Sequence, residues 1–155
     1  MALPSAFDPS LFLDATTEEA LEKRDPLPIG DYTAVIGEIT ARTWQGKSDP
    51  SKSGMAFDVP LILDIPAEIQ VEAGLTEPTF TIKDSLLLDT TPQGAIDWGK
   101  GKNARLRKYR EATDLNKPGE KFNPRMLQGK VITVKLKHEV VGDEIYERVA
   151  GVAMS

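Results

Sequence analysis

The chain has 155 residues, of which 40% are hydrophobic and 28% are charged, and it carries a formal net charge of −5. This composition is typical of an ordinary globular protein, and the length fits one domain with a short extension. Cysteine is absent, which excludes disulfides and thiolate metal sites. The first residues lack the basic and apolar segments of a signal peptide, and no stretch approaches the roughly 20 apolar residues that span a bilayer. We therefore expect a cytoplasmic protein with no membrane partner.

The first part of the chain is expected to be an arm over residues 1–29. Within it, residues 14–24 are predicted to form a short helix with a threonine N-cap, ended by the prolines that follow. From Gly30 the apolar residues alternate with polar ones, and their parity changes at Gly37. A glycine at a change of parity is typical of a β-bulge, so we predict one long, bent first strand. Residues 44–53 are then expected to form a polar loop.

Two further strands are predicted from a cleaner alternation. Every second residue from Met55 to Ile65 is apolar, and residues 79–88 repeat the pattern with Asp84 as an interruption. Phe57 and Phe80 share the inward parity of these strands and are expected in the core. The residues between the two strands, 66–78, are expected to form a loop.

A helix and a hairpin complete the pattern. Asn103 is expected to cap a helix over residues 104–115, whose apolar stripe includes Leu106 and Tyr109. Residues 130–138 and 145–152 alternate again, on either side of a Gly-Asp turn that is typical of a hairpin. This order predicts an all-β fold over residues 30–155. We expect an oligonucleotide/oligosaccharide-binding (OB)-like five-stranded barrel, with the helix between strands 3 and 4.

Charge is unevenly distributed along the chain. Residues 1–99 have 6 basic and 17 acidic side chains, whereas residues 100–155 have 13 basic and 7 acidic ones. Six of the basic side chains fall within residues 100–110, which contain no acid. Such a concentration in an acidic chain favours an anionic partner, with nucleic acid as the first candidate. A solvated helix face is the alternative that the charge pattern leaves open.

The residues that usually carry catalysis are sparse. His138 is the one histidine, so histidine pairs for metal ligation are absent, and its place beside a turn predicts a solvated side chain. The carboxylates follow no motif spacing, and Gly99–Lys102 does not match a phosphate-binding loop. We therefore expect no enzyme, no cofactor and no metal. A nuclease assembled from scattered carboxylates is the enzymatic alternative.

Binding of single-stranded nucleic acid has more support, because it needs cations for phosphates and exposed rings for bases. The candidate binding residues are two tryptophans and ten cations: Trp44, Lys47, Lys52, Lys83, Trp98, Lys100, Lys102, Arg105, Arg107, Lys130, Lys135 and Lys137. The outward face of strands 2 and 3 is a usual binding platform of OB folds, yet here it carries Asp58 and Asp64 and no aromatic ring. We therefore expect loop 44–52 and the fourth strand to contribute more than that face.

Several segments of the chain resemble small bacteriophage single-stranded DNA-binding proteins. They are Leu27–Ile36, Ser51–Gly54, Ile82–Leu88, Asn103–Leu115 and Leu127–Val134. The resemblance covers roughly residues 27–152 and implies an OB fold that coats single-stranded DNA during phage replication and recombination. It also implies that Lys52, Lys83, Lys130 and Lys135 occupy matching binding positions.

The resemblance has one departure and leaves several partners open. Many single-strand binders end in an acidic tail that recruits replication proteins, whereas this sequence ends in Val149–Ser155 without an acid. Recruitment of replication or recombination proteins through such a tail is therefore not expected. The sequence does not decide between DNA and RNA as the ligand, and it leaves the formation of a homo-oligomer open. The alternative function is a structural or adaptor protein, such as a virion component, whose basic helix docks an acidic protein partner.

Overall fold

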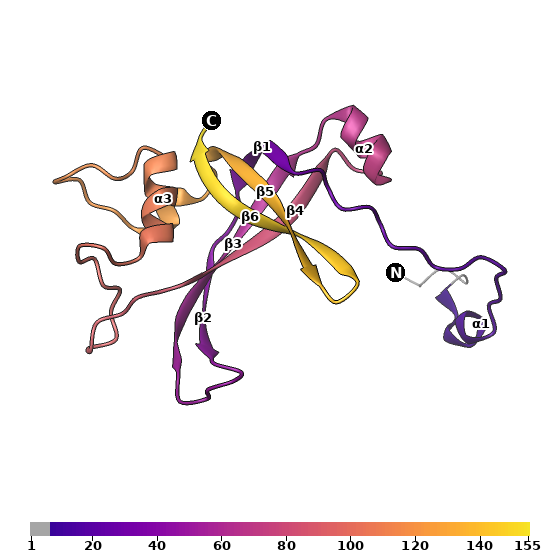
Figure 1. Cartoon of the computed structure of the whole chain (residues 1–155), viewed down its shortest axis with the longest axis horizontal. Helices are drawn as coiled ribbons and strands as arrows, with labels where there is room; N and C mark the ends of the chain where they lie inside the picture. The colour runs from indigo at the N-terminus through magenta and orange to yellow at the C-terminus, as the bar shows by residue number, and fades with distance from the viewer. Residues whose placement is uncertain (1–6) are drawn as a thin grey trace.

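The structure, a computed structural model, describes residues 7–155 and is built mainly from β-strands (Figure 1). The strands are β1 (Gly30–Ile36), β2 (Thr40–Gln45), β3 (Ser53–Asp64), β4 (Thr79–Leu87), β5 (Val131–Val141) and β6 (Glu144–Met154). The helices are α1 (Pro9–Leu13), α2 (Ala67–Ala73), α3 (Ala104–Ala112) and the 3₁₀ turn η2 (Pro124–Leu127). The expected all-β class and the helix ahead of the last hairpin are confirmed.

All six strands belong to one antiparallel sheet. β1 lies at its centre, with Ala34 opposite Leu63 of β3 on one side and opposite Ile132 of β5 on the other. β6 follows β5 through the two-residue turn at residues 142–143, as the Gly-Asp pair predicts. β4 extends the other side by pairing with β3. β4 and β6 approach each other, but no ladder joins them within residues 7–155, so the sheet is open there.

The predicted first strand is two strands in the structure. The chain breaks at Gly37, whose N–H donates to the Pro60 carbonyl at 2.8 Å. A Cβ on Gly37 would lie 3.0 Å from the Pro60 ring, so a larger residue would crowd this close approach. β3 pairs with both β1 and β2 along one edge. A bulge within one continuous strand was predicted at Gly37, whereas β1 ends there. β2 continues through Trp44, which was wrongly placed in the loop.

The core lies between the inward faces of the sheet and one face of α3. Its fully buried side chains follow the predicted period of two in the strands and the predicted stripe of the helix, and include Ile36, Val59, Leu61, Leu63, Leu106, Tyr109, Ile132 and Val134. Phe57 and Phe80 are only partly buried and pack against the margin of this core. Alternation therefore identified the inward face correctly, and overestimated burial near the strand ends.

A buried carboxylate fastens α3 to the sheet. Asp84 interrupts the apolar parity of β4 because its Oδ2 accepts a 2.7 Å hydrogen bond from the hydroxyl of Tyr109. Its Oδ1 pairs with the guanidinium of Arg105, one turn earlier on the helix. Burial, together with the Asp84 charge, raises the pKa of Tyr109 far above its ordinary value, so the hydroxyl stays a donor. Asp84, which interrupts the apolar pattern of β4, therefore makes a structural hydrogen bond and a structural ion pair with α3.

The start of α3 differs from the expectation. Asn103 precedes the helix at φ +49°, but its side chain does not cap the helix. Instead, its Oδ1 accepts from the N–H of Asp89 at 2.8 Å, and its Nδ2 donates to the carbonyls of Asp89 and Asp97. Asn103 therefore holds together the loop that connects β4 to α3.

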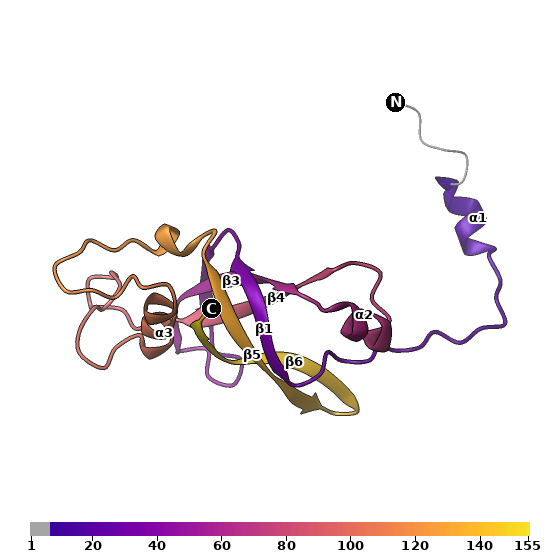
Figure 2. The ribbon, with the colours of Figure 1, turned by 90° about the horizontal axis from the view of Figure 1, so that it is seen from above.

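The arm also differs from the expectation. The helix predicted over residues 14–24 is wrong; residues 9–13 form α1 instead, with Asp8 accepting from the N–H of Ser10 at 3.1 Å. Figure 2 shows that the arm leaves the sheet and holds α1 away from it. The part of the expected arm at residues 1–6 lies outside the described residues. The segment expected to be a loop at 66–78 contains α2, which Gly74 ends with φ +71°.

The end of the arm nearest the sheet is held firmly. Leu27 is fully buried, and its N–H donates to Glu147 Oε1 at 2.9 Å. The Leu27 carbonyl accepts from His138 Nε2 at 2.7 Å, and His138 and Glu147 face each other across β5 and β6. Arg24 adds an ion pair to Glu147 at 2.7 Å. His138, expected to be solvated, is therefore partly buried and structural.

Replacing Tyr109 with phenylalanine is expected to lower the free energy of unfolding by about 1–3 kcal/mol, because the buried Asp84 carboxylate would lose a donor. Urea unfolding followed by circular dichroism measures this. Tyr146, whose side chain is 41% exposed, is the matched control. Its replacement by phenylalanine should change the free energy by less than about 0.5 kcal/mol. Equal small effects of the two substitutions would contradict a structural role for the Asp84 bond.

The Glu147 contact is expected to make stability depend on pH. Burial raises the pKa of Glu147, but the hydrogen bonds from Leu27 and Arg24 outweigh burial and hold the pKa below its ordinary value. The stabilisation is therefore complete above the unfolded-state pKa of about 4.3 and is lost as pH falls through the lower folded-state pKa. The difference in unfolding free energy between the wild type and Glu147→Gln should shrink below about pH 4.

Candidate nucleic-acid interface

A groove runs between β4 and the β5–β6 hairpin, where the sheet is open. We call it the seam groove. Four cations from separate elements line it, Lys83 on β4, Arg105 on α3, Lys137 on β5 and Arg148 on β6. Lys83 takes the outward parity of β4, and Lys137 lies directly opposite Arg148 in the ladder. The topology thus brings together positive charges that are up to 65 positions apart in the sequence.

The cations of the seam groove differ in how strongly they are engaged. Arg105 pairs with the buried Asp84 and also donates to the carbonyl of Ser85 at 3.0 Å. It therefore links α3 to β4. Arg148 pairs with Glu139 at 2.9 Å, and both side chains are about half exposed. Lys83 and Lys137 have no carboxylate within ion-pair distance among residues 7–155. These two lysines give the groove its net positive charge.

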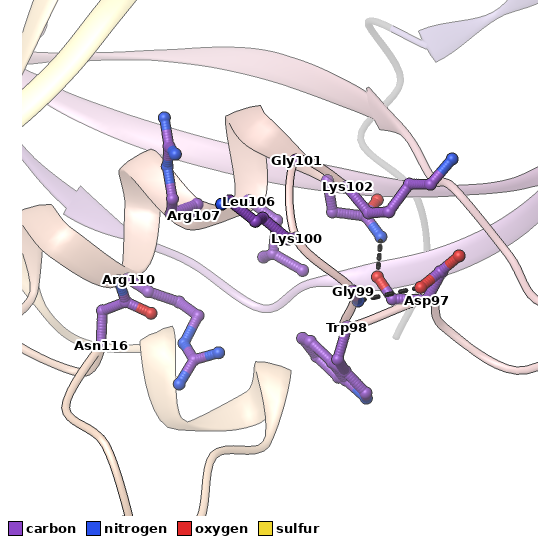
Figure 3. A pocket seen from close by; sticks show the side chains of 11 residues that line it. Asp97, Trp98, Gly99, Lys100, Gly101, Lys102, Leu106, Arg107, Arg110 and Asn116 are labelled. Atoms are coloured by element: carbon purple, nitrogen blue, oxygen red, sulfur yellow. Dashed lines mark hydrogen bonds between the residues drawn. The ribbon is translucent and has the colours of Figure 1, made fainter.

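A second basic cavity lies beside α3, and we call it the helix cleft. The loop before the helix and the side of the helix itself form its walls, with Lys100, Lys102, Arg107 and Arg110 as its cations (Figure 3). Asp97, at its rim, accepts a hydrogen bond from the N–H of Gly99 at 2.9 Å. The cleft has a volume of about 280 Å³. Positive charge therefore exceeds negative charge among the side chains that line it.

Two aromatic rings stand beside the helix cleft. Trp98 is 54% exposed and meets the ring of Phe122 edge-on, with centroids 6.0 Å apart. The guanidinium of Arg110 lies 4.1 Å from the Phe122 centroid and 5.8 Å from that of Trp98. Figure 3 shows Arg110 extending from the helix toward Trp98. Trp98 is thus the exposed ring of this group, and Phe122 is partly buried against the core.

Trp44 takes a different position from the one expected. It lies on β2 opposite Gly54, and a Cβ on Gly54 would come within 2.9 Å of the indole nitrogen. The ring therefore covers Gly54 and is partly buried. Its Nε1 is buried and has no hydrogen-bond partner within residues 7–155. Trp44 consequently offers less free surface for stacking than Trp98.

The acid on the outward face of β3 is neutralised. Asp58 is 8% exposed, and its carboxylate accepts from Ser85 Oγ at 2.7 Å and from Arg42 Nε at 2.8 Å. These two hydrogen bonds lower the pKa of Asp58 and keep it ionised. The sequence analysis treated Asp58 as a free negative charge, because the pattern does not show that Arg42 pairs with it. The outward face of β3 therefore repels an anion less than the sequence indicates.

The predicted binding residues fall into four groups in the structure. Lys83, Arg105 and Lys137 meet in the seam groove. Trp98, Lys100, Lys102 and Arg107 meet at the helix cleft. Trp44, Lys47 and Lys52 lie on or beside the β2–β3 hairpin, with both lysines exposed. Lys130 and Lys135 are exposed but line neither the seam groove nor the helix cleft.

Sequence reasoning missed several residues at these surfaces, namely Arg42, Phe122, Tyr146 and Arg148. The outward parity of the last strand was a usable signal for Arg148, whose guanidinium lies 5.1 Å from the ring centroid of Tyr146. The contact of Phe122 with Trp98 joins two loops, and no local pattern indicates it.

Within residues 7–155, no group of three or more potential metal ligands comes together. No helix in that range has the length and apolar character needed to cross a membrane. Comparison of the sequence with protein-family models and with curated proteins gives no match.

The two tryptophans are expected to differ in accessibility. Trp44→Phe leaves Trp98, which is 54% exposed, so acrylamide should quench the remaining fluorescence strongly. Trp98→Phe leaves Trp44, whose indole covers Gly54, and quenching should be weaker. Stern–Volmer titrations of the two folded variants test this order. Equal or reversed quenching constants would contradict the different environments of the two rings.

Proposed function

We propose that the protein binds single-stranded DNA along the seam groove, by phosphate neutralisation and base stacking and without sequence specificity. The observation that carries the proposal is the convergence of Lys83, Arg105, Lys137 and Arg148 on one groove of an acidic chain. Cations aligned in a groove are what a sugar–phosphate backbone requires, and they need no base-specific contact.

The fold supports the proposal when β1 and β2 are counted together as one bent strand. The order is then three strands, a helix and two strands, with the first strand between the second and the fourth. This order agrees with the proposal of an OB-like fold, in which the seam between β4 and β6 would be unpaired here. OB folds bind ligands on strands 2 and 3 and on the loops after strands 1 and 4. The seam groove borders the equivalent surface, β4 and the β5–β6 hairpin.

The charges of the groove suggest a modest binding footprint. Single-stranded DNA releases counterions with a slope of about −0.7 per neutralised phosphate, so the two lysines without an acidic partner correspond to a slope near −1.4. Tyr146 lies beside the groove under Arg148 and is 41% exposed, which makes it a candidate ring for stacking. Stacking of one base contributes about 1–3 kcal/mol.

The biological setting follows from the resemblance to phage single-strand binders. A protein of this kind coats transient single strands in the host-cell cytoplasm during replication and recombination, and it performs no covalent chemistry. The adaptor function remains the competing proposal, since basic surfaces also dock acidic proteins.

The test is a fluorescence-anisotropy titration with labelled dT oligonucleotides of several lengths, at low and moderate salt, against matched duplex. We expect binding that prefers single strands, strengthens with length and weakens with salt. Absence of binding at low salt would overturn the proposal and favour the adaptor function.

The site is tested by the double variant Lys83→Ala/Lys137→Ala, which removes the two unpaired cations of the seam groove. Its affinity should fall at least about tenfold, and its salt slope should decrease by about 1.4, because two phosphates lose their partners. Lys117→Ala/Lys121→Ala removes the same charge from the loop after α3 and is the matched control. Equal losses in the two double variants would place the binding site elsewhere.

A further inference from the structure

The arm presents apolar side chains that no other described residue, within 7–155, buries. No residue of α1 is buried, and Leu11, Phe12 and Leu13 are 60%, 60% and 88% exposed. A five-residue helix is too short to be stable through its backbone hydrogen bonds alone. An exposed apolar cluster on such a segment is typical of a docking sequence that is completed by a partner.

The charge of the arm restricts the chemistry of that partner. Residues 7–22 contain five acidic side chains and no basic one. A surface that matches the arm must therefore combine positive charge with exposed rings or apolar side chains. The helix cleft has this combination, because Lys100, Lys102 and Arg107 line the same cavity as Trp98. The complementary surface is thus present on the same chain.

The position of the arm favours a contact between copies. Its inner end is fixed by Leu27 and by an ion pair of 3.1 Å between Lys23 and Glu144 at the β5–β6 hairpin. In both views α1 and α3 lie at opposite ends of the molecule (Figures 1 and 2). The helix cleft of a neighbouring copy can be placed beside α1 without any rearrangement of the fixed inner end.

We propose that the acidic, apolar arm of one copy docks into the helix cleft of a second copy. Acidic side chains of the arm face the cations of the cleft, and the apolar residues of α1 pack against Trp98 and Phe122. Because the two surfaces differ, the contact is heterologous, so copies add head-to-tail into an open chain unless the rotation between them closes a ring. The seam groove takes no part in it, so the inference does not depend on the proposed function.

Sedimentation equilibrium of the full chain, without nucleic acid, tests this contact. We expect the average mass to rise with protein concentration at low salt and to fall when salt is added, because the matched charges are screened. Glu18→Lys/Glu19→Lys in the arm should weaken association at least about tenfold, and Lys100→Glu/Lys102→Glu in the cleft should do the same. Glu68→Lys/Glu72→Lys, two reversals on the exposed surface of α2, is the matched control.

The decisive variant combines the reversed arm and the reversed cleft in one chain. Its charges are complementary again, so association should return to within about threefold of the wild type. A mass that stays monomeric at every concentration, or a control that weakens association as much as the arm variant, would overturn the proposal. Failure of the combined variant to recover, with each double variant folded by circular dichroism, would also overturn it.

The apolar half of the contact is tested separately. Leu11→Ser/Phe12→Ser should weaken association at least about tenfold, since two exposed apolar side chains would no longer be buried. Val71→Ser, at an 83% exposed position of α2, should leave association unchanged. Unchanged association in the arm variant would exclude α1 as the docking segment.

Discussion

The buried carboxylate of Asp84 is the interaction on which the arrangement of this protein depends. A charge at 7% exposure is costly unless it is paired and hydrogen-bonded, and α3 supplies both partners through Tyr109 and Arg105. The helix is therefore held at the margin of β4, where β6 would otherwise have to complete the sheet. The contacts of Asp84 with Tyr109 and Arg105 take the place of a strand ladder between β4 and β6. The seam groove is the outer surface of this unpaired region.

The same network explains why the groove is basic. Arg105 is committed to Asp84, so its charge is offset, whereas Lys83 and Lys137 on the flanking strands have no acidic partner within the described residues. On the other side of β3, Arg42 neutralises Asp58 in a similar way. Asp84 and Asp58 are thus bound in structural contacts, and the two lysines of the seam groove determine the potential that a ligand meets there.

Local patterns predicted the strands, the inward faces and α3, because burial imposes a period of two or 3.6 residues on the sequence. They also located the irregularity at Gly37, where the apolar parity changes, although they predicted a bulge in one strand rather than two separate strands. They did not place α1, whose helix depends on Asp8 and Pro9 rather than on a buried stripe. Nor could they place the seam groove, because its cations come from four elements whose proximity depends on the tertiary fold.

The uneven charge of the sequence becomes a spatial separation in the fold. The acidic arm projects from one end, and the basic run forms α3 and its preceding loop at the other. Arg105 and Arg107 are two positions apart on that helix, so their side chains project from nearly opposite faces. One lines the seam groove and the other lines the helix cleft. The body of α3 therefore separates two basic surfaces, and occupation of one does not require release of the other.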